Sequence, residues 1–297
     1  MEGDRPSGAR GLPTSTHGHP VNTVIYDTSS PIGLFDSGIG GLTVARHVMS
    51  LLPHENVVYF GDTARVPYGS KSTQTVVTYA QQAVSFLVSQ GVKLIIVACN
   101  TASAVALEHS ARATSVPVVG VIEPGAHMAV ATTRNGIIGV IGTEGTVRSQ
   151  AYAAAIEVRN SSLIVHSRAC PLLVGFAEEG LDRHPATILM TEEYLRPLLN
   201  QHIDTLILGC THYPVLSGSI QHVTRGDVAL IDPGVATALE ARRILEEAGA
   251  LNRSTAVPRH DYYLSDFPHK FVEIGERFLG TSFDHVHRVS LDDLVRA

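Results

Sequence analysis

Eight short apolar segments recur along this chain, and an amphipathic stretch follows most of them. Each segment has three to five residues and is rich in β-branched side chains, as strands buried on both faces of a parallel sheet are. They are Ile32–Phe35, Val57–Phe60, Leu94–Ala98, Val118–Ile122, Ile137–Ile141, Leu163–Val165, Leu206–Leu208 and Val228–Ile231. Strands that alternate with helices predict a doubly wound α/β architecture.

The stretch between the second and third segments shows helical spacing. Between Ser72 and Gln90, Val76, Ala80 and Leu87 fall on one stripe, and Gly91 follows where a C-cap glycine would stand. We therefore expect a helix here, and similar helices between the other strands.

Composition excludes several classes of protein. The 297 residues include only 3 cysteines and carry a formal net charge of −6, with no basic run longer than two residues. A disulfide scaffold and a phosphate-backbone binder are thus disfavoured. No apolar stretch approaches the roughly 20 residues that span a bilayer. Residues 1–30 lack an apolar signal core and are predicted to be a disordered extension, so a cytoplasmic protein is expected.

Two cysteines occupy matched positions at predicted strand ends. Cys99 and Cys210 each follow a buried segment and a small residue, and each precedes hydroxyl or amide side chains. This similarity predicts an internal duplication, with two α/β lobes that each present one thiol. Each thiol should precede a helix, whose N-terminus favours the thiolate. Cys170 has no matching flank and is predicted to be structural.

Three chemistries remain open for the two thiols. Redox exchange usually employs a Cys-x-x-Cys pair, and this chain has none. A cysteine nucleophile assisted by His212 would leave Cys99 without a role. In two-base proton transfer, one thiolate removes a proton from a carbon and the opposite thiol protonates the other face. The scattered histidines predict no metal site.

Several motifs resemble those of the bacterial glutamate racemases. The principal ones occupy residues 32–44, 59–69, 98–103 and 208–214. Shorter matches occupy residues 120–125, 141–146, 170–173 and 178–180. The likeness covers about residues 31–250. Aspartate racemases share the two cysteines but usually carry Glu at the position of His212. The histidine in this chain therefore favours glutamate as the substrate.

The resemblance implies roles for particular residues. Cys99 and Cys210 would transfer the protons, Cys99 acting on D-glutamate and Cys210 on L-glutamate, with Asp36, His212 and Glu178 assisting. The substrate-binding residues would be Asp36, Ser37, Tyr68, Gly69, Asn100, Thr101, Thr143, Thr146, Thr211 and His212. The glycines at 38, 40 and 41 do not form a dinucleotide fingerprint, because Thr43 stands where its third glycine belongs.

The resemblance also implies the organisation and setting of the protein. Residues 31–122 with 235–297 would form the first lobe and residues 123–234 the second, related by a pseudo-twofold axis with the site between them. The enzyme would need no cofactor, act on small molecules rather than nucleic acid or membranes, supply D-glutamate for peptidoglycan, and form a homodimer. The alternatives are an aspartate or hydantoin racemase, a relative that only binds an acidic ligand or a protein partner, and a thiol oxidoreductase.

Overall fold

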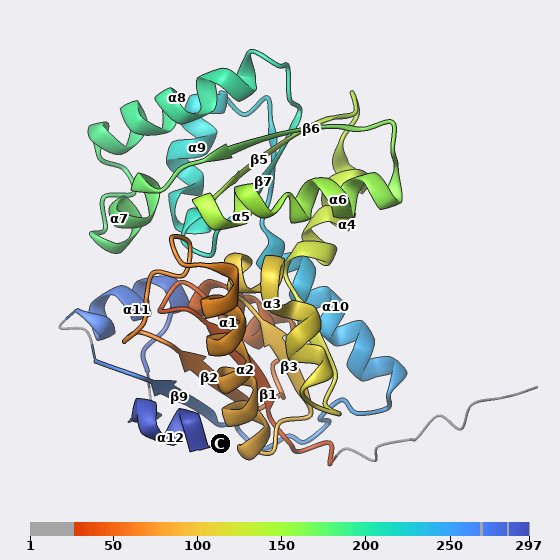
Figure 1. Ribbon diagram of the computed structural model, residues 1–297, viewed down its shortest axis with the longest axis vertical. Coiled ribbons are helices and arrows are strands. Elements are labelled where there is room, and N and C mark those ends of the chain that lie inside the picture. Colours follow the sequence, from red (N-terminus) through yellow and green to blue (C-terminus); the bar gives the residue numbers. More distant parts are fainter. Residues whose placement is uncertain (1–26, 268–269, 284, 297) are drawn as a thin grey trace, which may run out of the picture.

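The computed structural model describes residues 27–267, 270–283 and 285–296, which form two parallel β-sheets covered by helices (Figure 1). The two sheets define two lobes, one above the other in Figure 1. The predicted doubly wound α/β fold is confirmed. Most of the predicted N-terminal extension, residues 1–26, lies outside the described residues. Residues 27–30 form a turn in which the Ser30 N–H donates to the Asp27 carbonyl at 2.9 Å.

The first lobe is built on a six-stranded sheet in the order β10-β9-β2-β1-β3-β4. Its strands are β1 (Ile32–Asp36), β2 (Val57–Gly61), β3 (Leu94–Val97), β4 (Val118–Gly120), β9 (His260–Leu264) and β10 (His285–Arg288). The three central strands β1, β2 and β3 are buried at every residue, which explains their continuously apolar sequences.

Six helices of the described residues lie in the first lobe. They are α1 (Leu42–Leu51), α2 (Thr73–Ser89), α3 (Asn100–Arg112), α10 (Pro233–Glu247), α11 (Phe271–Leu279) and α12 (Leu291–Arg296). The predicted helix over residues 72–90 is confirmed as α2. The Ser72 side chain caps it by accepting from the Thr75 N–H, and Gly91 follows its end with φ +70°.

The second lobe is built on a four-stranded sheet in the order β6-β5-β7-β8. Its strands are β5 (Ile137–Gly142), β6 (Ile164–Ala169), β7 (Thr205–Gly209) and β8 (Ala229–Ile231). Its helices are α4 (Ile122–Thr132), α5 (Glu144–Ser149), α6 (Ala151–Arg159), α7 (Leu172–Glu178), α8 (Pro185–Leu199), the 3₁₀ helix η1 (Tyr213–Leu216) and α9 (Ser217–Thr224).

The two sheets repeat one topology. Numbered within its own lobe, each sheet has the core order second, first, third, fourth strand, and β9 and β10 extend the first sheet beyond β2. In this alignment β3 corresponds to β7, so the strands that precede Cys99 and Cys210 are equivalent. This repeat agrees with the duplication predicted from the sequence.

The chain crosses between the lobes twice. It leaves the first sheet after β4 into α4, and it returns after β8 through α10, which packs against both α1 and α4 (Figure 1). First-sheet strands fall within residues 32–120 and 260–288, and second-sheet strands within residues 137–231. The lobe boundaries near residues 122 and 235 remain a proposal.

The sequence prediction fell short at the less buried strands. β9 and β10 were missed, and β6 was predicted only in part, because these strands lack the continuous apolar runs of the buried central ones. The sequence of β10 is His-Val-His-Arg, and none of its four side chains is fully buried. The segment predicted to run to Ile122 ends as a strand at Gly120, since Ile122 already begins α4.

Candidate active site

The carboxyl ends of paired strands from both sheets meet at the lobe boundary. β1 lies beside β3 in the first sheet and β5 beside β7 in the second. In each pair the strand order reverses direction, and α/β proteins bind ligands beyond such a switch point. Asp36 and Cys99 stand at the ends of β1 and β3, while Thr143 and Cys210 follow β5 and β7.

Cys99 lies at the N-cap of α3 and is almost fully buried, with 6% of its side chain exposed. Its Sγ donates to the Ser37 Oγ at 3.5 Å. Burial, and after it the charge of Asp36, raise the pKa of the thiol from 9.0 to about 12, against the opposing hydrogen bond to Ser37. The N–H of Ala102, in the first turn of α3, lowers the pKa of Cys99 as predicted for a helix N-terminus, but burial outweighs this effect and favours the neutral thiol.

Asp36 is the buried carboxylate beside Cys99. Its Oδ2 accepts from the Gly38 N–H at 3.0 Å, and among the described residues Oδ1 has no hydrogen-bond partner. Burial raises the pKa of this carboxyl, while the charge of His212 and backbone N–H groups oppose the rise. A buried carboxylate oxygen without a donor requires one, and a ligand cation can supply it.

On the second lobe, three side chains form a hydrogen-bonded chain that we call the Cys210 relay: Cys210, His212 and Glu178. The Cys210 Sγ lies 3.8 Å from Nδ1 of His212, and Nε2 of the same ring lies 2.9 Å from Oε1 of Glu178. Cys210 is 6% exposed and His212 is 7% exposed. The geometry thus joins a thiol to a carboxylate through one imidazole.

Hydrogen bonds within the relay favour the charged form of its histidine. Burial opposes the imidazolium, but hydrogen bonds with Cys210 and Glu178 together raise the pKa of His212 from 6.5 to about 10. The hydrogen bond from His212 lowers the pKa of Glu178. Cys210 departs from one prediction, because η1, a 3₁₀ helix beginning at Tyr213, follows it before α9.

Glu178 and Glu179 have different surroundings. Glu178 ends α7 and reaches His212, whereas Glu179 forms an exposed ion pair of 2.8 Å with Lys270. The structure therefore brings Glu178, and not its neighbour, to the predicted site.

Threonine hydroxyls join the lobes at the strand ends. The Thr101 Oγ1 lies 2.9 Å from that of Thr143 and 3.3 Å from that of Thr146, and the latter two are 3.0 Å apart. Asn100 accepts at its Oδ1 from the Tyr152 hydroxyl at 2.7 Å. The contacts of Thr101 and Asn100 link α3 of the first lobe to the second lobe, so these predicted binding residues lie together at the boundary.

Tyr68 and Gly69 reach the same boundary from the loop after β2. The Tyr68 hydroxyl donates to Asp62 Oδ2 at 2.5 Å, and the Gly69 carbonyl accepts from the Gly145 N–H at 2.9 Å. A Cβ at position 69 would lie 2.7 Å from the Thr143 Cβ, so glycine permits this close approach.

Gly40, in the turn after β1, lies against the Cys210 relay. A Cβ on Gly40 would lie 2.6 Å from the His212 ring and would overlap the Thr211 hydroxyl. The Thr211 carbonyl accepts from the Thr43 hydroxyl at 2.9 Å, which fixes its strand end to α1. The glycine run of the first motif therefore allows the two lobes to approach each other at the site.

Sequence analysis missed two residues that support the site. Asp62 orients Tyr68 and also accepts from Arg65 at 2.7 Å. Its position inside the motif at residues 59–69 could have indicated a role at the site. Tyr152 orients Asn100 from α6, and no local pattern marked it. Cys170, predicted to be structural, is fully buried, and its Sγ donates to the Arg168 carbonyl at 3.6 Å.

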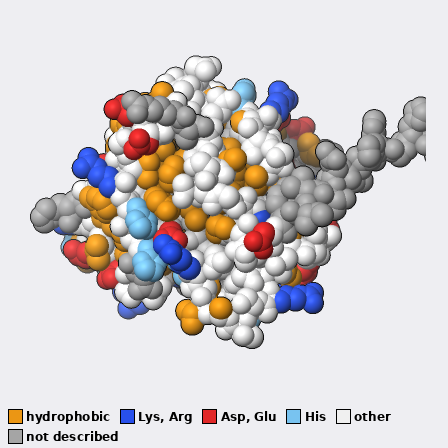
Figure 2. Space-filling view, turned by 90° about the horizontal axis from the view of Figure 1, so that it is seen from below, with side chains coloured by type: hydrophobic (Ala, Val, Ile, Leu, Met, Phe, Trp, Pro, Cys, Tyr) orange, Lys and Arg blue, Asp and Glu red, His pale blue; other side chains and the backbone are white. Residues whose placement is uncertain are grey.

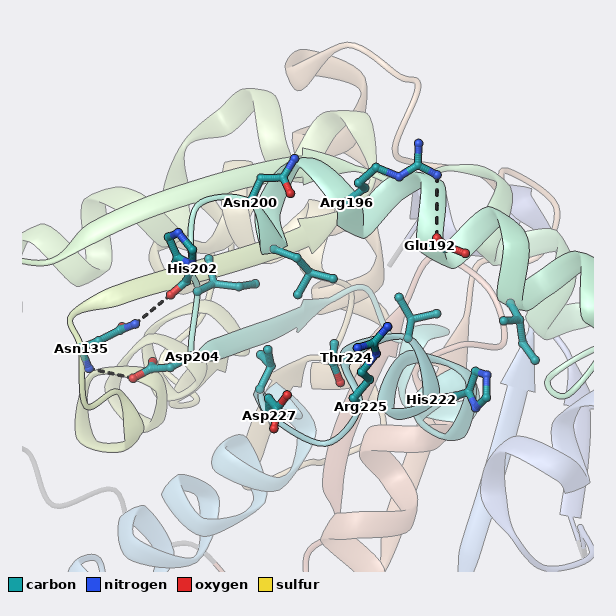
Figure 3. A pocket seen from close by; sticks show the side chains of 15 residues that line it. Asn135, Glu192, Arg196, Asn200, His202, Asp204, His222, Thr224, Arg225 and Asp227 are labelled. Atoms are coloured by element: carbon teal, nitrogen blue, oxygen red, sulfur yellow. Dashed lines mark hydrogen bonds and ion pairs between the residues drawn. The ribbon is translucent and has the colours of Figure 1, made fainter.

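A separate hollow of about 630 Å³ lies on the second lobe, away from the strand-end site (Figure 3). Several of its polar side chains already have partners: the Asn135 amide donates to the His202 backbone carbonyl at 2.7 Å, and Glu192 pairs with Arg196 at 3.9 Å. None of the predicted site residues is among those that line it.

The described residues contain neither a helix long and apolar enough to cross a membrane nor a group of three metal-ligating side chains. On the face shown in Figure 2, acidic and basic side chains lie singly or in small groups around a band of hydrophobic atoms.

Comparisons with known proteins agree with this architecture. A family profile described as Asp/Glu/Hydantoin racemase matches residues 43–241. The glutamate racemase of Syntrophus aciditrophicus is 50% identical over 261 residues, covering 88% of this chain and 97% of that protein.

Solved structures of glutamate racemases also share the fold. The enzyme from Francisella tularensis, in complex with D-glutamate, has a TM-score of 0.84 and 42% identity, covering 89% of this chain and 99% of its own. An isoform from Bacillus anthracis has a TM-score of 0.85 and 41% identity, covering 89% and 98%.

The two-lobed fold with its site at facing strand ends defines the class, an amino-acid racemase, which is an isomerase. The chain belongs to the Asp/Glu/Hydantoin racemase family, and its relatives at half identity place it among the glutamate racemases.

Proposed function

We propose that this chain interconverts L- and D-glutamate by two-base proton transfer between Cys99 and Cys210. One observation carries the proposal: two buried thiols stand at equivalent strand ends of a duplicated fold, facing one boundary from opposite lobes. Inverting a stereocentre requires a base on one face of the α-carbon and an acid on the other. Two thiols on opposing lobes provide both.

The two thiols have different surroundings. Cys99, whose pKa is raised to about 12, is a thiol at neutral pH and can donate a proton. His212, whose pKa is raised to about 10, is an imidazolium there, and its Nδ1 lies 3.8 Å from the Cys210 Sγ, where it can donate to that sulfur when Cys210 acts as the base. This state is ready for L-glutamate: Cys210 removes the α-proton and Cys99 protonates the opposite face.

A second turnover in the same direction requires Cys99 to regain a proton and Cys210 to lose one. After one turnover Cys99 is the thiolate and Cys210 the thiol, which is the state that accepts D-glutamate. The Ser37 hydroxyl can donate to the Cys99 thiolate, as His212 donates to that of Cys210. The Glu178 carboxylate stabilises the His212 imidazolium while Cys210, protonated by the substrate, is a neutral thiol.

Substrate binding uses the unsatisfied and neutral groups at the boundary. The free Oδ1 of Asp36 is suited to the substrate ammonium. Backbone N–H groups and the hydroxyls of Thr101, Thr143, Thr146 and Thr211 are suited to carboxylates. The α-hydrogen is very weakly acidic, so these fixed donors also stabilise the carbanion-like transition state.

The setting of the enzyme follows from this chemistry. Thiols that must stay reduced fit a cytoplasmic enzyme, and the three cysteines are all unpaired. We propose that no cofactor takes part, that the product D-glutamate supplies peptidoglycan synthesis, and that the chain forms a homodimer. Light scattering on the purified protein measures the last point.

Substrate and thiol variants test the proposal together. We expect racemisation of glutamate to exceed that of aspartate and of hydantoins. Cys99→Ser and Cys210→Ser should each lower kcat by at least about 100-fold, the range for losing a positioned acid or base. Cys170→Ser is the matched control, because it alters a buried thiol outside the site. Full activity of either catalytic variant would reject the two-base mechanism.

The same purified protein separates the remaining alternatives. A preference for aspartate would assign the chain to a sister activity, and binding of glutamate without turnover would leave a ligand-binding relative. A thiol oxidoreductase instead predicts a Cys99–Cys210 disulfide, which intact-mass spectrometry under non-reducing conditions detects.

A further inference from the structure

The C-terminal end of α7, which carries Glu178, is held by a side chain from the other lobe. Arg277 on α11 donates through Nη2 to the carbonyls of Ala177 at 2.8 Å and Glu178 at 2.7 Å. In Figure 1, α7 lies at the lower edge of the second lobe, facing α11. The last carbonyls of a helix have no intrahelical partner and favour a cation, so Arg277 caps α7.

The next residue of α11 contacts the histidine of the same relay. Phe278 is fully buried, and its ring meets that of His212 edge to face, with centroids 5.3 Å apart and an interplanar angle of 85°. His212 is therefore hydrogen-bonded at Nδ1 and Nε2 and packed against Phe278 on its side. Two consecutive first-lobe residues thus hold two members of a second-lobe relay.

A glycine after Glu179 leaves room for this arrangement. Gly180 has φ +71°, and a Cβ on it would overlap Nη1 of Arg277 and lie 3.2 Å from Cζ. Any side chain at position 180 would displace the guanidinium. The Glu-Glu-Gly sequence therefore combines a relay carboxylate with the space that its cap needs.

We propose that Arg277 and Phe278 are positioning residues that hold Glu178 and His212 in line with Cys210. Neither touches a reacting atom; Arg277 fixes the backbone of Glu178, and Phe278 fixes the plane of the imidazole. This inference rests on the proposed function, in which the relay serves the proton transfer at Cys210. It also means that this half of the site is assembled only when α11 and α7 are in contact.

A neighbouring contact supplies a matched control. Lys270, directly before α11, forms an ion pair with Glu179, and both side chains are about half exposed. Lys270→Met removes a cation from the same lobe contact without touching Ala177 or Glu178. A merely adhesive role for the contact predicts that this variant and Arg277→Met behave alike.

Kinetics with deuterated substrates test positioning. We expect Arg277→Met and Phe278→Leu to lower kcat about tenfold with KM changed less than about twofold, a loss realised in the transition state. The α-deuterium isotope effect should rise for L-glutamate, whose proton Cys210 removes, more than for D-glutamate. Arg277→Lys should recover part of kcat, since its ammonium can still donate to one carbonyl. Lys270→Met should stay within about twofold of the unmodified protein.

Two results overturn the inference: kcat in Arg277→Met no lower than in Lys270→Met, or isotope effects that rise equally in both directions. Thermal melts report whether each variant folds, and if Arg277→Met does not, Arg277→Lys and Phe278→Leu are judged by the same criteria. The proposed function fails separately, if the unmodified protein does not racemise glutamate.

A spectroscopic measurement needs no turnover. Charges that act on His212 include those of Cys210, Glu178 and Asp36. ¹⁵N-histidine NMR follows the titration of His212, with His212→Asn for assignment. Loosening Glu178 in Arg277→Met should lower the titration midpoint of His212 by about one pH unit. An unchanged midpoint would contradict the positioning role.

Discussion

The protonation of Cys99 provides a quantitative test of the site. A pKa raised from 9.0 to about 12 leaves about 1000-fold less thiolate at pH 7 than an ordinary thiol has. Only the thiolate reacts with iodoacetamide, so the alkylation rate of Cys99 should keep rising with pH beyond pH 10. Cys99 is only 6% exposed, and this limited access lowers the alkylation rate at every pH. It does not move the midpoint of the rate profile, which is the pH at which half of Cys99 is thiolate.

Two variants should move the midpoint in opposite directions. Asp36→Asn removes a charge that raises the pKa of Cys99, so it should accelerate alkylation about tenfold at pH 8, while burial persists. Ser37→Ala removes the hydrogen bond of 3.5 Å that stabilises the thiolate, so it should slow alkylation.

Peptide mass spectrometry measures the modification of Cys99 separately from that of the other thiols. Time courses between pH 7 and 11, with urea-unfolded protein as the reference for an ordinary thiol, give the midpoint in each variant. A midpoint near 9 in the folded protein would refute the view that burial controls Cys99. So would a slower Asp36→Asn or a faster Ser37→Ala.

Three further predictions concern packing and stability. Gly40→Ala should reduce kcat at least about tenfold without unfolding the protein, because the new Cβ would lie 2.6 Å from the His212 ring. Steady-state kinetics measure kcat, and circular dichroism reports whether the variant folds. A folded variant with near-normal kcat would contradict this prediction. Lys93→Met should cost about 3–5 kcal/mol by leaving Glu55, its buried partner at 2.6 Å, without a cation. Urea unfolding measures the loss, which Lys93→Met/Glu55→Gln should partly restore; a loss below about 1 kcal/mol would refute the estimate. Because folding raises the pKa values of His212 and Cys99, both groups stabilise the folded protein fully below pH 6.5. The free energy of unfolding should therefore fall as pH rises from 6.5 through about 10, where His212 titrates, and on towards 12, where Cys99 titrates. A free energy of unfolding that stays constant above pH 6.5 would contradict both shifts.

The strand ends were predictable from the sequence because central parallel strands are buried on both faces. Segments such as Leu94–Ala98 are continuously apolar, and the polar cluster that follows marks where the strand stops. The matched cysteines at two such ends indicated the duplication. The common core order of the two sheets agrees with that duplication.

The rest required three-dimensional information. β9 and β10 are only partly buried, and their half-polar sequences resemble loops. The partner of His212 could not be derived from spacing, because Glu178 lies 34 residues earlier and reaches it only through the fold. Local sequence suggested a thiolate at Cys99, whereas burial, a property of the whole lobe, decides the opposite.

The central claim is that two thiols act on opposite faces of one carbon, and an isotope experiment in D₂O tests it most directly. Reduced protein is incubated with unlabelled L-glutamate, and both enantiomers are separated on a chiral column and analysed for α-deuterium by NMR. The samples are taken before about 10% conversion, when little product has been converted back to substrate. The account predicts deuterium in nearly all D-glutamate and almost none in the remaining L-glutamate, with the mirror result from D-glutamate. D-glutamate that retains the original α-hydrogen would mean that one group transfers the same proton across, and it would contradict the account.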